Sequence, residues 1–211
     1  MTLALDALVV AGGIFFGRLI ARVVRRGKQD GGPVASADAK DGVPVRADSP
    51  DPLEGFTCAL GDVITRRVEG DEAWLAGALL FMEERTVAVL FIAPEAHGDR
   101  AVLVPGPAQT TLAWLAPLPA GEVVVSGDPP RAIEHAGTHF ERTRRLPVHV
   151  RRLGTGAPEV GPTAVFGEYV APGLDRMVVI AGSVASLAWR GIALTEGDYE
   201  VLPGGKATLE P

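Results

Sequence analysis

The chain contains two degraded copies of one sequence pattern, and this internal repeat constrains the architecture more than any single motif. Residues 61–125 resemble residues 137–201. The matched segments are 61–66 with 137–142, 92–94 with 170–172, 100–106 with 176–182, 112–114 with 187–189, and 121–123 with 197–199. Apolar runs and turn residues repeat, whereas no group of reactive side chains repeats with them. We therefore predict two similar halves, residues 53–130 and 131–211.

Both halves have the pattern of short β-strands. Residues 146–151 alternate between apolar and polar side chains, and 86–93 and 176–181 are continuous apolar runs, as in strands buried on both faces. Pairs such as Pro105-Gly106 and Gly127-Asp128 mark turns between these runs. We expect a mainly β fold of two tandem β-rich halves, each a small barrel or a strongly bent sheet, packed together.

The first 26 residues differ from the rest. Residues 7–24 are largely apolar and, as a helix, would be about 27 Å long, close to the hydrocarbon thickness of a bilayer. Arg18 and Arg22 lie toward one end, where long arginine side chains reach the headgroups. No basic residue precedes the apolar run and several follow it, which places that end in the cytoplasm. Residues 1–26 are therefore predicted to be a single-pass anchor, with the soluble domain on the cytoplasmic side.

Two alternatives to this membrane topology stay open. Arg18, Arg22 and Arg25 share one helical face, so the segment is also compatible with a helix lying in the membrane interface. The opposite orientation would make the β-rich part an extracytoplasmic envelope domain.

Small residues recur along the predicted anchor, at Gly13, Gly17 and Ala21. A stripe of small side chains lets two helices approach closely in lipid. It suggests self-association, or association with a partner helix, through this face. Residues 27–52, which follow the anchor, are rich in Gly, Pro, Ala, Asp and Ser and are predicted to be a disordered linker.

Charge and cysteine content exclude several classes of function. Residues 53–211 carry 13 Lys and Arg against 20 Asp and Glu, a net charge of 13 − 20 = −7, with Lys206 as the one lysine. Such an acidic domain is poorly suited to bind a nucleic-acid backbone. Cys58 is the single cysteine, so neither an intrachain disulfide nor a cysteine-based metal site is expected. We expect Cys58 to be a buried core residue.

The most basic stretch of the β-rich part is a candidate anion-binding patch. It contains Arg142, Arg144, Arg145, His149 and Arg151. If 138–145 and 146–153 pair as a hairpin, Arg145, His149 and Arg151 lie on one face, where they could bind anionic headgroups or an acidic partner. The competing interpretation is a solvated strand face whose arginines pair with nearby carboxylates.

Other chemically interesting residues lack the spacing that their chemistry requires. His135 and His139 lie at a predicted strand edge and turn around Gly137, and in a continuous strand they would be about 13 Å apart, too far for one metal ion. Ser183 and Ser186 lack the second glycine of a Gly-x-Ser-x-Gly turn, and no histidine follows them. Trp114 and Trp189 are aligned in the repeat, and we expect each to cover the core of its half or to meet the other between the halves.

Two segments of the β-rich part resemble a known family. Gly61-Asp62-Val63-Ile64 followed by Glu72-Ala73-Trp74-Leu75, and Trp189-Arg190-Gly191-Ile192-Ala193-Leu194 running into Tyr199-Glu200-Val201-Leu202-Pro203-Gly204-Gly205, are similar to the opening and closing segments of the bacterial domain of unknown function 4178 family. The resemblance covers about residues 55–206. It implies a bacterial source, a β-rich fold and a membrane-linked setting, and it brings no catalytic residues with it.

The sequence thus predicts a binding or scaffold protein, tethered to the bacterial cytoplasmic membrane and without enzymatic activity or cofactor. We expect a protein partner whose identity the sequence does not specify. The alternative is an enzyme or small-molecule sensor with a pocket between the two halves.

Overall fold

The computed structural model describes residues 51–95, 98–123, 125 and 127–204. These residues form one compact unit that is mainly β, as expected, and they contain no α-helix. The strands are β1 (Val63–Arg66), β2 (Glu72–Trp74), β3 (Gly77–Met82), β4 (Thr86–Ala93), β5 (Arg100–Val104), β6 (Leu112–Pro117), β7 (Ala132–His135), β8 (Thr138–Gly154), β9 (Thr163–Val170), β10 (Asp175–Gly182), β11 (Ser186–Leu194) and β12 (Tyr199–Leu202).

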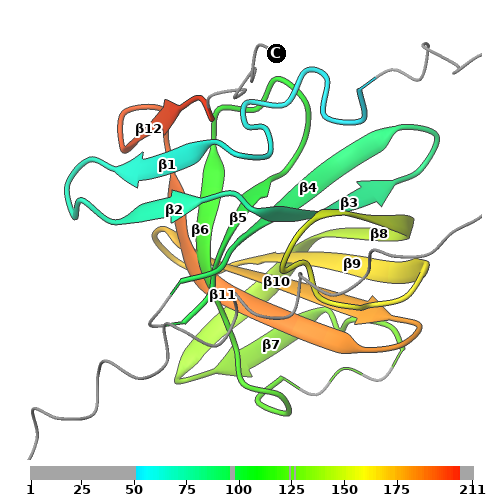
Figure 1. The fold of residues 1–211 in the computed structure, drawn as a ribbon. Coiled ribbons are helices and arrows are strands. Elements are labelled where there is room, and N and C mark those ends of the chain that lie inside the picture. The colour runs from blue at the N-terminus through cyan, green and yellow to red at the C-terminus, as the bar shows by residue number, and fades with distance from the viewer. Residues whose placement is uncertain (1–50, 96–97, 124, 126, 205–211) are drawn as a thin grey trace, which may run out of the picture. The chain divides into compact units, whose positions relative to one another are not determined.

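Eight antiparallel strands close into a barrel. Their order is β3-β4-β5-β6-β11-β10-β9-β8, and β3 pairs with β8 to complete the circle. Residues 53–130 contribute β3 to β6, and residues 131–211 contribute β8 to β11. The two halves therefore do not form separate barrels, because each supplies four strands to a single one (Figure 1).

The barrel interior is one apolar core that both halves share. Inward-facing side chains from all eight strands belong to a single buried cluster, which includes Leu79, Leu103, Phe166 and Ile180. The rings of Phe81 and Phe166, one from each half, lie 4.7 Å apart and are fully buried. Since neither half encloses this core alone, the two must fold together.

Two further apolar clusters lie on the outside of the barrel. A three-stranded sheet, β12-β1-β2, and the segment before β1 cover the outer face of β3 to β6. The segment leading to β7, with β7 itself, covers outward-facing side chains of β8 to β11, including Tyr169 and Met177. Figure 1 shows the three-stranded sheet on one side of the barrel and β7 on another.

The barrel closes where β3 meets β8, and glycine is required on both strands there. Gly77 and Gly154 are directly opposite each other. A Cβ at Gly77 would lie 2.1 Å from the carbonyl oxygen of Thr155, and one at Gly154 would lie 2.2 Å from that of Ala76. Gly154 also has φ of +65°, a backbone conformation that residues other than glycine rarely adopt. This close backbone contact explains both glycines.

Strand β8 is continuous over residues 138–154, so the hairpin considered for 138–145 and 146–153 does not form. Its first part pairs with β9 through 141–149, and its last part pairs with β3 through 149–154. A register shift between Arg142 and Arg144 reverses the direction in which successive side chains point. One strand thus joins the second half of the barrel to the first, a role that local sequence does not reveal.

Two pairs of repeat-aligned segments fall in corresponding barrel strands but do not face the same way, whereas 61–66 and 137–142 fall in β1 of the small sheet and β8 of the barrel. Segments 100–104 and 176–180 lie in β5 and β10, and 112–114 and 187–189 lie in β6 and β11. Trp189 belongs to the interior cluster, whereas Trp114 lies on the outer face under the three-stranded sheet. A shift of one residue in a strand exchanges its two faces. In these strands, the aligned residues of the two halves therefore point to opposite faces of the barrel wall.

The predicted anchor (1–26), its small-residue stripe at Gly13, Gly17 and Ala21, and nearly all of the predicted linker (27–52) lie outside the described residues. In the part of the chain that the structure describes, no helix has the length and apolar character needed to cross a membrane.

Replacing Phe81 with Ala should lower the free energy of unfolding by about 3–5 kcal/mol, because it leaves a cavity in the shared core. Guanidinium unfolding followed by tryptophan fluorescence and far-UV circular dichroism would measure the change. Val184→Ala is the control, since Val184 is 67% exposed, and it should change stability by less than about 0.5 kcal/mol. Two separate unfolding transitions would contradict a core shared by both halves.

Candidate functional site

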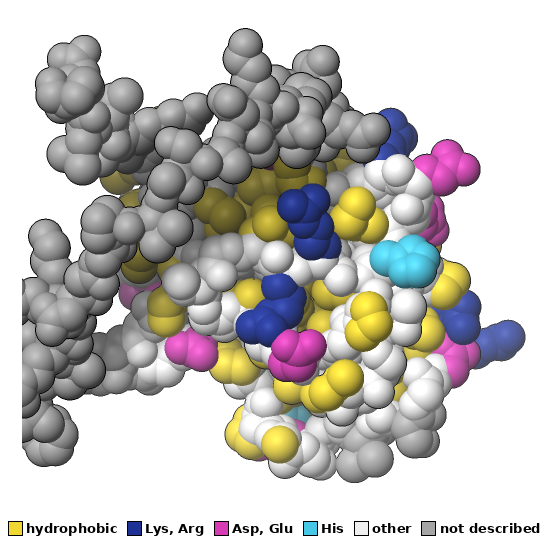
Figure 2. Space-filling model, turned by 45° about the vertical axis from the view of Figure 1, so that its right-hand side comes forward, with side chains coloured by type: hydrophobic (Ala, Val, Ile, Leu, Met, Phe, Trp, Pro, Cys, Tyr) yellow, Lys and Arg dark blue, Asp and Glu magenta, His cyan; other side chains and the backbone are white. Residues whose placement is uncertain are grey.

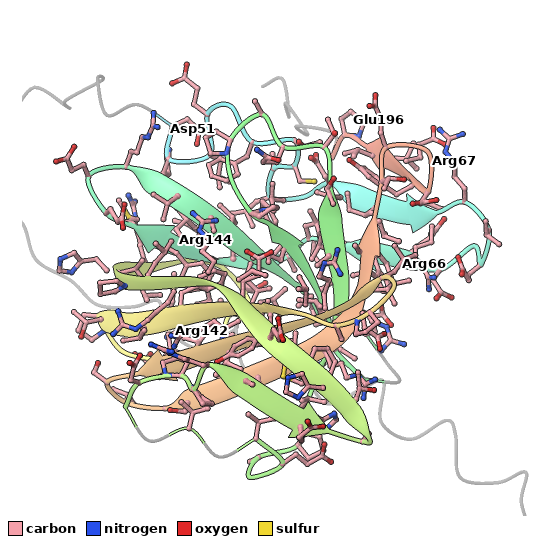
Figure 3. All side chains as sticks on the ribbon, turned by 180° about the vertical axis from the view of Figure 1, so that it is seen from behind. Asp51, Arg66, Arg67, Arg142, Arg144 and Glu196 are labelled. Carbon is pink, nitrogen blue, oxygen red and sulfur yellow. The ribbon has the colours of Figure 1, made fainter. Side chains whose placement is uncertain are left out.

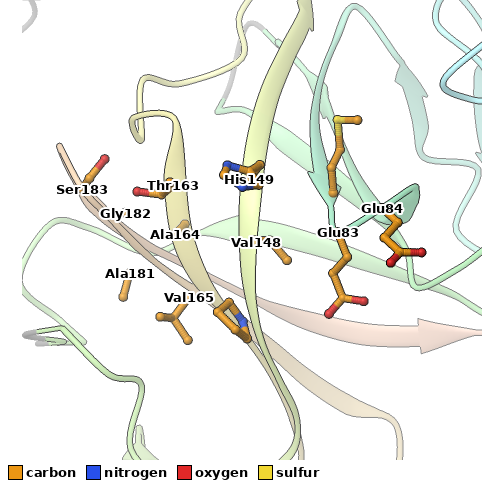
Figure 4. A pocket seen from close by; sticks show the side chains of 12 residues that line it. Glu83, Glu84, Val148, His149, Thr163, Ala164, Val165, Ala181, Gly182 and Ser183 are labelled. Atoms are coloured by element: carbon orange, nitrogen blue, oxygen red, sulfur yellow. The ribbon is translucent and has the colours of Figure 1, made fainter.

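An open depression of about 670 Å³ lies on the barrel wall where the two halves meet. Met82, Glu83 and Glu84, at the β3–β4 turn, line one side of it, and the rest of the lining comes from β8, β9 and the end of β10. Figure 4 shows Glu83 and Glu84 on one side of β8, with Thr163 and Ser183 on the other. The site therefore needs strands from both halves, and no single segment of sequence contains it.

The depression combines apolar walls with a few polar groups. Pro147, Val165 and Ala181 supply apolar surface. The polar side chains are those of Glu83, Glu84, His149, Thr163 and Ser183, and within the described residues none of them hydrogen-bonds to another side chain. Such free groups above an apolar floor are suited to orient a bound ligand.

The predicted anion patch is largely engaged within the protein. Arg144 donates to the carbonyl oxygens of Pro105 at 2.5 Å and Val87 at 3.2 Å. Arg145 donates to Asp128 at 2.6 Å, and Arg142 donates to the carbonyl oxygen of Pro129. Figure 3 shows that Arg142 and Arg144 extend toward different parts of the molecule although both lie on β8. Three of the five predicted residues thus brace the fold.

His149 and Arg151 are the two members of the predicted patch that remain exposed without a hydrogen bond or ion pair to another described side chain. With Arg145 they lie on the outer side of β8, at alternate positions of one continuous strand. Of these, only His149 lines the depression. On the face seen in Figure 2, hydrophobic, basic and acidic side chains are interspersed, and no area of one charge dominates.

Sequence inspection missed a polar network around Arg190 on β11. Its guanidinium donates to His135 Nδ1 at 3.2 Å, to Asp175 at 3.3 Å and to Thr138 at 3.2 Å, and it lies 5.1 Å from the centre of the Phe140 ring. Because Nδ1 of His135 accepts from arginine, its proton is assigned to Nε2, which donates to Glu122 at 2.9 Å. The network fixes β7 and the preceding loop to the barrel.

The neighbouring histidine is also paired, since His139 contacts Glu134. No group of three His, Cys, Asp or Glu side chains suited to hold a metal ion occurs among the residues that the structure describes.

Glu168 is a second feature that sequence inspection missed. It lies on the inward face of β9, half-buried, opposite Arg144 in the β8–β9 register. Burial raises the pKa of its carboxyl group, and the guanidinium groups of Arg144 and Arg176 oppose that shift. Glu168 sits in the barrel wall, separate from the depression, and the signal that could have identified it is its charge within an otherwise apolar strand.

Cys58 is a core residue, as expected. It is 2% exposed and packs with Ile64 and Tyr199 beneath the three-stranded sheet. Burial, reinforced by nearby Asp62, raises the pKa of its thiol to about 12. Since the thiolate is the nucleophilic form, Cys58 is unsuited to nucleophilic chemistry at neutral pH.

The depression offers hydrogen-bonding groups but, among the described residues, no activated nucleophile. In the depression, the hydroxyl groups of Thr163 and Ser183 lack the hydrogen-bonded base that would activate them as nucleophiles. Carboxylates, an imidazole and hydroxyls can nevertheless hydrogen-bond to a polar ligand or to a peptide backbone. Comparison with family models, curated proteins and solved structures finds no match for this chain.

Replacing Arg144 with Ala should destabilise the fold by about 2–3 kcal/mol, because two partly buried carbonyl groups lose a charged donor. Arg144→Lys should restore only part of this loss, since lysine lacks the forked guanidinium group. Arg151→Ala is the control and should change stability by less than about 0.5 kcal/mol. Urea unfolding measures all three; equal effects of the 144 and 151 substitutions would show that Arg144 is not a brace.

Proposed function

We propose that this protein is a binding or scaffold module that holds a partner in the depression between the two halves of its barrel. The observation that carries the proposal is the lining of that depression by Met82–Glu84 from one half and by β8, β9 and β10 from the other. Its polar groups are free and its walls are apolar, as expected of a recognition surface.

A filled barrel interior supports recognition on the outside. The interior cluster consists of tightly buried side chains from every strand, so the wall is the surface on which a ligand can be accommodated. An extended segment of a protein partner suits an open, shallow site, because it can place alternate side chains into the depression and direct its backbone toward Thr163 and His149.

The proposal includes tethering to the bacterial cytoplasmic membrane through residues 1–26, with the barrel on the cytoplasmic side. Support for this comes from the apolar run at 7–24 and the basic residues that follow it. Gly13, Gly17 and Ala21 would mediate self-association of the anchor. The resemblance to the domain of unknown function 4178 family supports the bacterial and membrane-linked setting.

The proposal also includes duplication of one β unit, and the support for it is the strand order of the two halves. Each half supplies four successive antiparallel strands, and the halves meet through β3 with β8 and through β6 with β11. Trp114 and Trp189 face opposite sides of the barrel wall, which indicates that the strands of the two copies have since shifted in register relative to each other.

A small-molecule sensor is the second candidate, and the position of the depression between the halves favours it. A ligand of this class would contact Glu83 or Glu84 from one half and His149 or Ser183 from the other. Its binding would then stabilise the junction that closes the barrel.

A photo-crosslinking amino acid at position 163, in the full chain made in its native membranes, should give a discrete protein adduct because the Thr163 side chain is exposed within the depression. The same amino acid at position 134, on β7 away from the depression, is the matched control and should give none. Gel electrophoresis and intact-mass measurement distinguish a crosslinked partner protein from a crosslinked small molecule, which would add only a small mass. Equal adducts at both positions would contradict binding in the depression.

The full chain should sediment with membranes, whereas a chain starting at Leu53 should remain in the supernatant, because the apolar run has been removed. Immunoblotting of the two fractions provides the measurement. Washing at alkaline pH separates a spanning segment, which stays in the pellet, from an interfacial helix, which is released. Finding the full chain in the supernatant would rule out the tether without affecting the binding proposal.

A further inference from the structure

The outer face of the three-stranded sheet carries a row of apolar side chains. Val63 on β1 is directly opposite Leu202 on β12 and Trp74 on β2, so the three form one line across the sheet. Trp74 is 56% exposed and Leu202 is 45% exposed. With strands about 4.8 Å apart, the row is about 10 Å wide, which matches the diameter of one α-helix.

Trp74 contrasts with the other two tryptophans of the chain. Trp114 and Trp189 are 5% and 4% exposed and belong to the outer and inner clusters of the barrel. The opposite face of the same small sheet, with Ile64 and Ala73, already packs on the barrel. The exposed row therefore contributes nothing to the described core, and tryptophan exposed in this way is typical of recognition surfaces.

Acidic side chains flank the row. Glu72 and Glu200 lie on the same outer face, each two residues along its strand from the row and both opposite Thr65. Neither forms an ion pair with a described residue. Two residues along a strand correspond to about 7 Å, so the carboxylates stand at the edge of the apolar row.

The remaining charges at this end of the sheet do not cancel those two carboxylates. Glu69 and Asp71 are paired with Arg66, at 2.6 Å and 3.2 Å. Arg67 donates through Nε to the carbonyl oxygen of Tyr199 at 3.2 Å. Figure 3 labels Arg66 and Arg67 beside this sheet. With Glu196 and Asp198 in the turn before β12, six carboxylates stand against two guanidinium groups, and the face is both apolar and acidic.

We propose that this face, consisting of Val63, Trp74 and Leu202 with Glu72 and Glu200, is a docking surface for a basic amphipathic helix of a partner protein. The helix would lay its apolar stripe across the row and direct Lys or Arg side chains to the two glutamates. This surface is separate from the depression, so the inference stands independently of the proposed function.

Charge decides between this occupant and the alternatives. An anionic lipid surface would be repelled by Glu72 and Glu200. Two copies of the chain related by a two-fold axis would bring the same acidic face against itself, which like-charge repulsion disfavours. A segment with apolar and basic side chains satisfies both properties of the face.

The test uses the emission of Trp74 in the full chain. The probe is a synthetic 18-residue helix with leucine on one face and arginine on the other, and its charge-reversed control carries glutamate in place of arginine. We expect a saturable blue shift with the arginine helix and none with the glutamate helix. The shift should be absent from Trp74→Phe, because the two remaining tryptophans are already buried.

A matched pair of variants separates local recognition from general attraction to an acidic protein. Glu72→Gln with Glu200→Gln should weaken binding about five- to tenfold. Glu134→Gln with Glu141→Gln changes the net charge equally on β7 and β8 and should leave affinity unchanged. Equal weakening by both pairs, or equal binding of the glutamate helix, would overturn the proposal.

Two further outcomes would also overturn it in favour of another occupant. A blue shift of Trp74 on addition of phosphatidylglycerol vesicles, without one from the arginine helix, would assign the face to lipid. A dimer in analytical ultracentrifugation that Trp74→Glu dissociates would assign the face to a second copy of the chain.

Discussion

The pairing of β3 with β8 is the contact on which the rest of the structure depends. It closes eight strands around one apolar interior, and it brings Gly77 and Gly154 into backbone contact where no side chain fits. Without this pairing the eight strands would form one open sheet with an exposed apolar face, because the two halves would be joined only through β6 and β11. The same junction places the β3–β4 turn beside β8, so barrel closure also creates the depression that we propose as the binding site.

Because the interior is filled and much of the barrel's outside is covered, both binding proposals concern exposed surfaces. Arginine side chains that could have formed a free anion site instead bind backbone carbonyl groups or Asp128, as Arg144 and Arg145 do. The Arg190 network in turn fixes β7 and the loop before it, which cover the outside of the second half of the barrel. The depression and the outer face of the three-stranded sheet both combine apolar side chains with polar groups that lack a described side-chain partner, which is why both proposals concern binding.

Much of the secondary structure could be predicted, because alternation and turn residues are local. The apolar runs 86–93 and 176–181 do lie within β4 and β10. The continuous course of β8 could not be predicted, because its partners β9 and β3 are remote in sequence. His149 is the member of the predicted anion patch that lines the depression. Glu83 and Glu84 line it too, but no local sequence pattern indicates this. The exposure of Trp74 was likewise not predicted, because it depends on which face of the small sheet packs on the barrel.

By itself, the sequence determined a mainly β protein with many short strands and a buried Cys58, because side-chain alternation and turn preferences act over a few residues. Only the tertiary structure decided that the two halves share one barrel, that Trp114 and Trp189 face opposite sides of its wall, and that the arginines of β8 serve as braces. A strand has two equivalent faces and two edges, and only its partners determine which of them is buried.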